Sequence, residues 1–365
     1  DPETNRANQQ TVETLAGQAL QRQQITANGL LHSEKEGTLY DIGLWLMEPN
    51  RMLNQRWLSV ARYLLPAFNL WAFYHFLDTD SLGPLLSGLA LAWLIIFIFS
   101  KYIFRQHKLI TKKGAILEQY AGILNSFSKV DAGNAALLQS AKKDAHDAAK
   151  GIYQLARLSS MFDQRLNLVV FAVLNGFVLY DIQCMLELEK WKSTYKDRFD
   201  LWVDIVGRIE LWNSLAGFRF NNPGYTFPLV HEQVCIIATD LAHPLIPASQ
   251  NVSNSMELGS GEKLVILTGS NMSGKTTFLR TIGVNMVLAQ CGAPVNATAF
   301  SFRPMLILTS IRVGDSLQEN TSYFMAELKK LRSIIDVLAG GVPALVLIDE
   351  ILRGTNSDDK THGSE

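Results

Sequence analysis

The strongest chemical signal in the 365-residue sequence is a glycine-rich loop that ends in a lysine and a threonine. From Gly269 to Thr276 it reads Gly-Ser-Asn-Met-Ser-Gly-Lys-Thr, which matches the pattern G-x-x-x-x-G-K-[ST]. Backbone N–H groups in such a loop curl around phosphate groups, and the positive end of the following helix adds attraction. A glycine turn formed by chance would rarely have an apolar run before it and a helical pattern after it. We therefore predict a nucleotide-binding site.

Each residue type in this loop has a chemical role. The ammonium group of Lys275 would reach the β- and γ-phosphates, and the hydroxyl group of Thr276 would be a ligand of Mg²⁺. ATP and Mg²⁺ are therefore the expected cofactors. The predicted nucleotide-binding residues of the loop are Gly269, Ser270, Asn271, Met272, Ser273, Gly274, Lys275, Thr276 and Thr277.

Two acidic residues after a later apolar run complete this chemistry. The continuous apolar run 344–348 is typical of a strand buried on both faces, and Asp349 and Glu350 follow it. A carboxylate at such a strand end organises Mg²⁺ in phosphate-binding-loop enzymes, and its neighbour is placed to polarise an attacking water. An acidic strand end can also serve solubility alone, but the loop upstream favours the functional interpretation. We predict Thr276 and Asp349 as metal ligands, and Lys275 and Glu350 as catalytic residues.

The elements that position these residues alternate between strand and helix. Short apolar runs predict strands and longer periodic stretches predict helices, and this alternation implies an α/β sheet. The predicted strands cover residues 234–238, 263–267, 305–311 and 344–348, and the predicted helices cover 276–290 and 322–338.

Upstream, the sequence predicts a helical region. Residues 105–225 place apolar side chains three and four positions apart, and the turn-forming stretch 221–224 marks a domain boundary. The apolar run 166–180 has 15 residues, a length that suits a buried core helix better than a third membrane span. Residues 1–56 are expected to form an N-terminal helical segment.

A charge-free stretch of 20 residues, 81–100, is long enough to cross a hydrocarbon core of about 30 Å. A buried core helix is the alternative. The weaker segment 57–77 precedes it, and the short acidic link between the two predicts a hairpin. Lysine and arginine flank both outer ends, so the positive-inside rule places the flanks, and the ATP site with them, in the cytoplasm. We therefore predict a transmembrane helical hairpin over 57–104, with membrane lipid as a partner.

The composition excludes several other classes of protein. Thirty-three Lys and Arg residues balance 34 Asp and Glu residues, so the chain lacks the overall positive charge of a strongly basic nucleic-acid binder, although a local basic patch stays possible. The three cysteines are far apart and have no metal-ligand spacing, which argues against a disulfide framework or a structural metal. Charged residues make up only 18%, which suits a chain with a membrane segment.

Four motifs in this order resemble the MutS family. Residues 268–277 are similar to its T-G-x-N-M-x-G-K-[ST]-T, and Asn271-Met272 is the most specific part. Residues 322–328 resemble S-T-F-x-x-E-[LM], residues 349–357 match D-E-[IL]-x-R-G-T-[SN], and residues 243–245 resemble H-P-[LV]. The resemblance covers about residues 210–365.

The resemblance implies an ABC-like ATPase that works as a dimer and holds ATP between two chains. Ser322 would then begin a helix that contacts the γ-phosphate bound by the partner chain, to which a helix N-terminus and a hydroxyl group are suited. Thr355 and Asn356 would lie in a loop that crosses the dimer interface, and Arg353 would be structural. Residues 105–225 would correspond, by position, to a shortened core and lever region.

Three features depart from the family. The mismatch-reading Phe-x-Glu motif does not occur, Asn251 precedes the V-x-N where many members have an aromatic residue that packs on adenine, and His362 is too early to be the switch histidine. We therefore expect the chain to be a fragment of a longer protein, with an incomplete ATPase domain that does not turn over ATP by itself.

Together these features predict a membrane-anchored, MutS-like ATPase with a helical part and an α/β part. The expected segments are 1–56 (helical), 57–104 (transmembrane hairpin), 105–225 (helical core and lever) and 226–365 (ATPase domain). We expect a homodimer that acts on DNA. Two alternatives stay open: an ATP-driven membrane protein and a nucleotide-gated scaffold, neither of which acts on DNA. Replacing Glu350 by Gln separates the scaffold from the others, because a scaffold does not need turnover.

Overall fold

The computed structural model groups the chain into two compact units. The described residues are 2–31, 38–233, 235–259, 264–270, 273–311 and 323–349. One unit, here called the α/β unit, comprises Asp1–Gly17, Ala132–Leu137 and Ser214–Glu365; the other, the helical unit, comprises Gln18–Asp131 and Leu138–Asn213. This division differs from the four segments expected from the sequence, because the first helix groups with the α/β unit rather than with the rest of residues 1–56.

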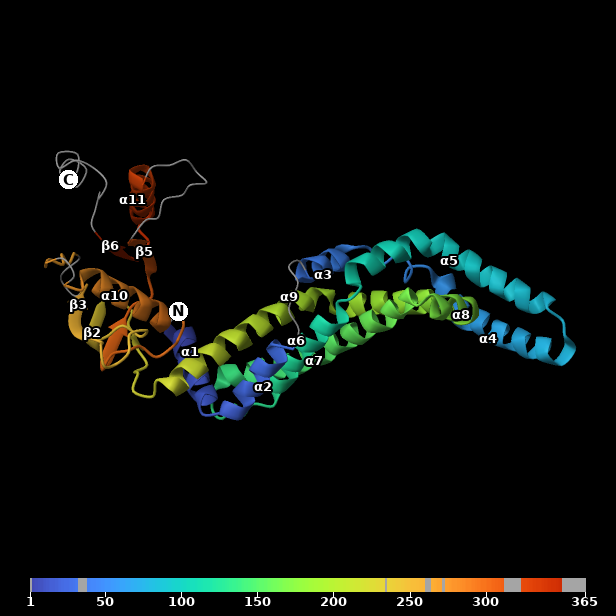
Figure 1. Cartoon of the computed structure of the whole chain (residues 1–365), viewed down its shortest axis with the longest axis horizontal. Helices are drawn as coiled ribbons and strands as arrows, with labels where there is room; N and C mark the ends of the chain where they lie inside the picture. Colours follow the sequence, from blue (N-terminus) through green and yellow to red (C-terminus); the bar gives the residue numbers. More distant parts are fainter. Residues whose placement is uncertain are drawn as a thin grey trace. The chain divides into compact units, whose positions relative to one another are not determined.

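The helical unit is built from long helices, as the periodicity of residues 105–225 predicts (Figure 1). Two of these helices, α7 and α9, continue into the residues of the α/β unit. The helices are α2 (Ala19–Gly29), α3 (Thr38–Met47), α4 (Arg56–Thr79), α5 (Gly83–Ile110), α6 (Gly114–Ser128), α7 (Ala136–Asp163), α8 (Leu168–Val178) and α9 (Tyr180–Asn221), with the short 3-10 helix η1 (Gln164–Leu166) between α7 and α8.

Small residues allow α7 and α9 to approach closely. Gly151 of α7 lies against the ring of Trp202 of α9, where an added Cβ atom would come within 2.2 Å of the ring. Its carbonyl oxygen accepts a hydrogen bond of 2.8 Å from Nε1 of Trp191. Trp191, Tyr195 and Trp202 contact one another through their rings, so this aromatic cluster leaves no room for a side chain at Gly151.

Two buried charged residues of α9 hold the segment around Trp45–Leu53. The Glu189 carboxylate accepts hydrogen bonds from the backbone N–H groups of Met52 and Leu53. Lys192 donates from Nζ to the carbonyl oxygens of Trp45 and Glu48 at 3.3 and 2.8 Å. Burial lowers the pKa of Lys192, which the nearby Glu189 carboxylate opposes. Because their buried polar groups have partners, these two side chains fix the segment instead of destabilising the core.

Helices α4 and α5 form a helical hairpin (Figure 1). Among the described residues, α5 is the one single helix long and apolar enough to cross a membrane, and a second candidate arises only if α8 and α9, bent by 77°, count as one span. Helix α4 does not meet the same criterion. The hairpin is therefore present as helices, whereas its insertion into a membrane stays a proposal.

The described residues of the α/β unit form two sheets. Strands β1 (Leu229–Val230), β4 (Ala299–Phe302), β2 (Ile236–Leu241) and β3 (Asn254–Leu258) form one sheet in that order, with only β1 and β4 parallel. Strands β5 (Leu306–Ser310) and β6 (Ala344–Ile348) pair in parallel in the other. Helices α10 (Lys275–Gln290) and α11 (Tyr323–Ala339) complete the unit. The predicted strand at 344–348 has its predicted bounds, and the predicted strand at 305–311 and both predicted helices differ from the observed elements by one residue at one or both ends. The strand predicted at 234–238 overlaps β2 but begins two residues and ends three residues too early.

One predicted strand is wrong. Residues 264–267, the described part of this predicted strand, form no strand, and Leu264 and Ile266 are exposed. A strand needs hydrogen bonds to a neighbouring strand, and the described residues provide none beside this run. Instead, an open apolar groove lined by Val287, Ile307 and Leu347 runs between α10 and the β5–β6 sheet. Local hydrophobicity therefore predicts a strand here that does not form, whereas β3 and β4 form without a local signal that we recognised.

The first helix, α1 (Pro2–Ala16), supports the end of α10. Asn5 is buried, and its Nδ2 donates to the carbonyl oxygens of Ala289 and Gln290 at 2.8 and 3.0 Å. These carbonyl groups lack partners within the helix, because a helix leaves its last four carbonyl oxygens unpaired. Gly292 follows with φ of +79°, and a Cβ atom there would come within 2.7 Å of Asn8. Helix α1 thus caps the helix that begins at the predicted phosphate loop.

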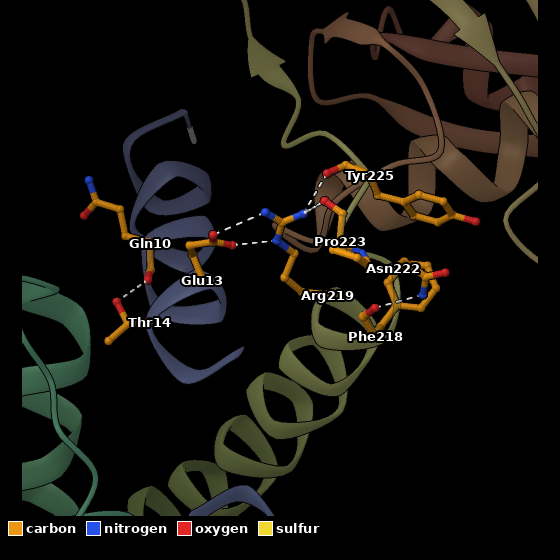
Figure 2. Close-up of polar contacts among 8 residues, drawn as sticks. All are labelled: Gln10, Glu13, Thr14, Phe218, Arg219, Asn222, Pro223 and Tyr225. Carbon is orange, nitrogen blue, oxygen red and sulfur yellow. Dashed lines mark hydrogen bonds and ion pairs between the residues drawn. The ribbon is translucent and has the colours of Figure 1, made fainter. Parts of the chain in front are cut away.

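A second contact of α1 is an ion pair at the end of α9. Figure 2 shows Arg219 between Glu13 of α1 and the turn that leads to β1. Its Nε atom lies 2.7 Å from the Glu13 carboxylate, and Nη1 donates to the carbonyl oxygens of Pro223 and Tyr225, both at 2.9 Å. The single guanidinium group therefore fixes both the chain direction after α9 and the position of α1.

We expect Gly151→Ala to lower the free energy of unfolding of the helical unit by about 1–3 kcal/mol, because the new methyl group displaces the Trp202 ring. The exposed Gly207 on α9 is the matched control, because no atom lies within 4 Å of its added Cβ and alanine favours helix by up to about 1 kcal/mol. All seven tryptophans lie in the helical unit, so tryptophan fluorescence during denaturation reports on this unit. Equal effects of the two substitutions would contradict the packing argument.

We expect Asn5→Ala to lower the local stability at the end of α10 by about 1–2 kcal/mol, because the Gln290 carbonyl loses the Asn5 donor and the Ala289 carbonyl keeps only its bond from the Gly292 N–H. Hydrogen–deuterium exchange of peptides covering residues 281–293 measures this change directly. Gln10→Ala, on the exposed side of α1, serves as the control and should change exchange by less than about 0.5 kcal/mol. Unchanged exchange in Asn5→Ala would show that α1 does not support α10.

Candidate functional site

The phosphate loop begins helix α10. Gly274 precedes the helix with φ of +92°, a conformation that residues with side chains rarely adopt. The first helical residue is Lys275, followed by Thr276 and Thr277. The free N–H groups of the first turn therefore lie directly after the glycine loop, as the loop pattern predicts.

Lys275 folds back over the loop. Its Nζ atom donates to the carbonyl oxygens of Gly269 and Ser270, both at 2.8 Å. Gly269 is itself close to Ser273, since an added Cβ atom would lie 2.8 Å from the serine hydroxyl oxygen. The ammonium group thus sits over a curled backbone, which is the location from which it can neutralise a bound phosphate.

The loop and the second predicted element meet at a hydrogen bond between side chains. Thr276 donates from Oγ1 to Oδ2 of Asp349 at 2.7 Å, across 73 residues of sequence. Asp349 lies directly after β6, and its backbone N–H donates to the carbonyl oxygen of Ser310 at the end of β5. Because β5 and β6 are parallel, their carboxyl ends meet at one edge, and this places the carboxylate beside the start of α10.

A hydroxyl oxygen and a carboxylate oxygen in contact suit a hard divalent cation. Mg²⁺ prefers oxygen ligands, commonly one or two carboxylates together with phosphate and hydroxyl oxygens. The structure therefore brings Thr276 and Asp349, the two predicted metal ligands, within hydrogen-bond distance of each other, and their role as ligands stays a prediction. Lys275 and the loop residues Gly269, Ser270, Ser273, Gly274 and Thr277 belong to the same end of α10.

Several predicted residues lie outside the part of the chain that the structure describes. These are Asn271, Met272, Ser322, Glu350, Arg353, Thr355, Asn356 and His362. The roles assigned to Glu350 as catalytic residue and to Ser322 as a residue acting on a partner chain therefore stay predictions.

Asn285 holds the middle of α10 and was not recognised from the sequence. It is fully buried, and its Nδ2 donates to the carbonyl oxygen of Ala242 at 3.0 Å. Its Oδ1 accepts from the N–H of Asn296 at 2.9 Å. Helix α10 is thus fastened to the segments that follow β2 and precede β4. An asparagine among apolar residues of a helix was the available signal.

Asn251 has a structural task in this unit. Its Oδ1 accepts from the N–H of His243, and its Nδ2 donates to the carbonyl oxygen of the same residue at 2.7 Å. The histidine ring accepts from the N–H of Leu245 through Nδ1 at 3.2 Å. The residue that stands where many MutS proteins have an aromatic side chain thus organises the His-Pro-Leu turn through hydrogen bonds.

Comparison with known proteins supports this interpretation of the loop. A family model described as "MutS domain V" matches residues 265–362. A "DNA mismatch repair protein MutS" from Synechococcus sp. is 39% identical over 143 residues, 37% of this chain and 16% of that protein. A protein of the same name from Finegoldia magna is 33% identical over 163 residues, 43% of this chain and 19% of that protein.

A third relative, "MutS protein homolog 4" from Mus musculus, is 38% identical over 121 residues, 32% of this chain and 12% of that protein. The matched segments thus cover less than a fifth of each relative. The family match contains the phosphate loop and Asp349, the residues that the structure brings together. Residues 265–362 therefore match MutS domain V, and this part of the chain is similar to proteins of the MutS family.

Proposed function

We propose that the chain binds ATP with Mg²⁺ at the Thr276–Asp349 edge, and that the complete ATPase domain of the longer protein expected above hydrolyses it. The hydrogen bond of 2.7 Å between these side chains carries the proposal, because it unites the phosphate loop with the acidic strand end. Mg²⁺ bound by Thr276 and Asp349 would neutralise charge on the phosphates. Lys275 contributes a fixed positive charge from the loop, and the first-turn N–H groups of α10 donate to phosphate oxygens.

Two residues complete the proposed reaction: Glu350, from its place at the acidic strand end, and Ser322, from the position that the MutS resemblance assigns. Glu350 directly follows Asp349 and polarises the attacking water. Ser322 acts on the ATP of a second copy, so the ATPase is an ABC-like homodimer that closes on ATP and opens after hydrolysis. The protein's contribution is thus positioning and charge stabilisation at a preformed edge.

We also propose that the α4–α5 hairpin anchors the chain in a membrane, with the ATPase domain in the cytoplasm. Many large apolar side chains of these helices are exposed, among them Trp71, Tyr74, Leu86 and Phe97. Exposed apolar surface of this extent is unusual on a protein surrounded by water. Lys and Arg residues flank both outer ends of the hairpin and the link carries two Asp residues, which fits the positive-inside rule.

The proposed substrate class is DNA. The relatives with which residues of this chain align are named as DNA mismatch repair proteins, and this is the observation that favours DNA over membrane work or a scaffold. The mismatch-reading Phe-x-Glu motif does not occur in the sequence, so we propose structured or branched DNA rather than single mismatches.

We expect Lys275→Ala to weaken binding of a fluorescent ATP analogue about 10- to 100-fold, because a charge-assisted contact is lost. Thr276→Val and Asp349→Asn should weaken binding about tenfold in Mg²⁺ and little in EDTA. Thr298 is the matched control, since its hydroxyl donates to Asp240 at 3.0 Å in an equivalent pair far from the loop in sequence. Weakening by Thr298→Val equal to that by Thr276→Val would refute the assigned site.

Glu350→Gln should keep ATP binding and reduce hydrolysis about 100-fold, because the water loses its base. The experiment measures binding and phosphate release on the same preparation in lipid nanodiscs. It includes homoduplex, mismatched and branched DNA over a salt series. Stimulation by branched DNA that fades with added salt supports DNA as substrate. A rate of ATP hydrolysis that no DNA changes but that depends on lipid would overturn DNA as the substrate and favour membrane work. Full function of Glu350→Gln in cells would indicate a scaffold.

A further inference from the structure

Helix α8 is the most apolar helix of the helical unit, and it lies outside the proposed α4–α5 hairpin. No charged residue occurs from Asn167 to Tyr180. Its side chains at Val169 and Val173 are 70% and 51% exposed, although the helix contacts α4 and α5 on another side. With 11 residues, α8 is about 16 Å long, too short to cross a hydrocarbon core of about 30 Å.

The chain enters and leaves α8 at a shared charged site. Arg165 precedes the helix and Asp181 follows it, and their side chains form an ion pair at 3.2 Å. At the far end of α8 the chain turns sharply, because Leu179 adopts φ of +54° and α8 meets α9 at 77°. The two charged residues that flank the apolar run are thus joined to each other by an ion pair, in which the Asp181 side chain is fully buried.

Contacts of α8 with α4 and α5 indicate the depth of α8 in the proposed membrane. On α4, the buried Asn69 donates from Nδ2 to the carbonyl oxygen of Gly176 at 2.9 Å. Asn69 is seven residues beyond Arg62, the last charged residue before the apolar part of α4, which corresponds to about 10 Å along a helix.

Helix α5 gives a similar depth independently. Trp93 packs edge-on against Phe171 of α8, with ring centroids 5.6 Å apart. Trp93 is eight residues before Lys101, the first charged residue after the apolar part of α5, which corresponds to about 12 Å. Both helices therefore place α8 about one third of the way into a hydrocarbon core.

We propose that α8 is a re-entrant membrane segment that dips into the bilayer beside the hairpin and contacts lipid acyl chains through its Val169 and Val173 face. This proposal rests on the membrane anchoring proposed above. Asn69 holds the segment at its depth by a hydrogen bond to the backbone of α8, which is stable where water is excluded. Gly88 of α5 leaves the space that the Asn69 side chain of α4 occupies, since an added Cβ atom at Gly88 would lie 2.0 Å from Oδ1 of Asn69.

The test places an environment-sensitive NBD fluorophore on single cysteines, after Ala replaces the cysteines at 184, 235 and 291. The full chain is reconstituted in phosphatidylcholine–phosphatidylglycerol vesicles with doxyl groups near the head group or in the middle of the acyl chain. Val173→Cys reports on α8, Leu94→Cys on α5 at an equivalent depth, and the exposed Tyr153→Cys on α7 is the aqueous control.

We expect NBD at 173 and at 94 to emit at shorter wavelength than NBD in water, and to be quenched more strongly by the mid-chain doxyl lipid than by the head-group doxyl lipid. NBD at 153 should keep the emission wavelength of NBD in water. Quenching at 94 without quenching at 173 would overturn the re-entrant segment and leave the hairpin intact. Quenching at neither position would overturn both proposals. A blue shift at 173 without quenching by either lipid would show that protein, such as a second copy, covers α8, and this also overturns the proposal.

A second measurement does not depend on removal of cysteines. Benzoylphenylalanine at position 173 of the natural chain should form a crosslink to lipid under light, detected by mass spectrometry. A crosslink to protein alone contradicts the proposal. Asn69→Ala should reduce the preference of NBD at 173 for the mid-chain quencher, while the preference at 94 stays the same, because only α8 loses its hydrogen bond.

Discussion

The hydrogen bond between Thr276 and Asp349 is the constraint on which the α/β unit depends. It forms only if a helix N-terminus and the carboxyl end of a parallel strand reach the same edge, so the register of β5 with β6 and the placement of α10 must both be fixed. Asn285 holds the middle of α10, and Asn5 of α1 caps its last turn. These amide groups favour one position of α10, because any other position would leave a buried donor or acceptor unpaired and would destabilise the fold.

The helical unit depends on a different factor, namely where its large apolar side chains are buried and where they are exposed. Its aromatic cluster around Trp191 and Trp202 forms a close-packed core, and Glu189 and Lys192 satisfy the backbone groups of the neighbouring segment. The α4–α5 hairpin instead leaves large apolar side chains exposed while it buries a polar one, Asn69. A polar group inside and apolar groups outside is the distribution expected of helices that pack together within lipid.

The sequence predicted local features well and distant contacts poorly. The start of α10 and the strand before Asp349 have signals within a few residues, and the structure confirms both elements. The strand expected at 263–267 failed because its hydrophobicity says nothing about a pairing partner. The contacts of Asn5 with α10 and of Arg219 with Glu13 connect residues more than 200 positions apart, and no local pattern announces such pairs.

The chain separates the two kinds of chemistry that we propose for it. The atoms suited to bind phosphate and a divalent cation lie in the α/β unit, and the surfaces suited to lipid lie in the helical unit. Helix α9 is continuous from Tyr180, next to the bend after α8, to Asn221, where Arg219 fixes the turn into β1. The family match falls within the α/β unit, so the function proposed for the helical unit rests on its own surfaces rather than on the resemblance to MutS.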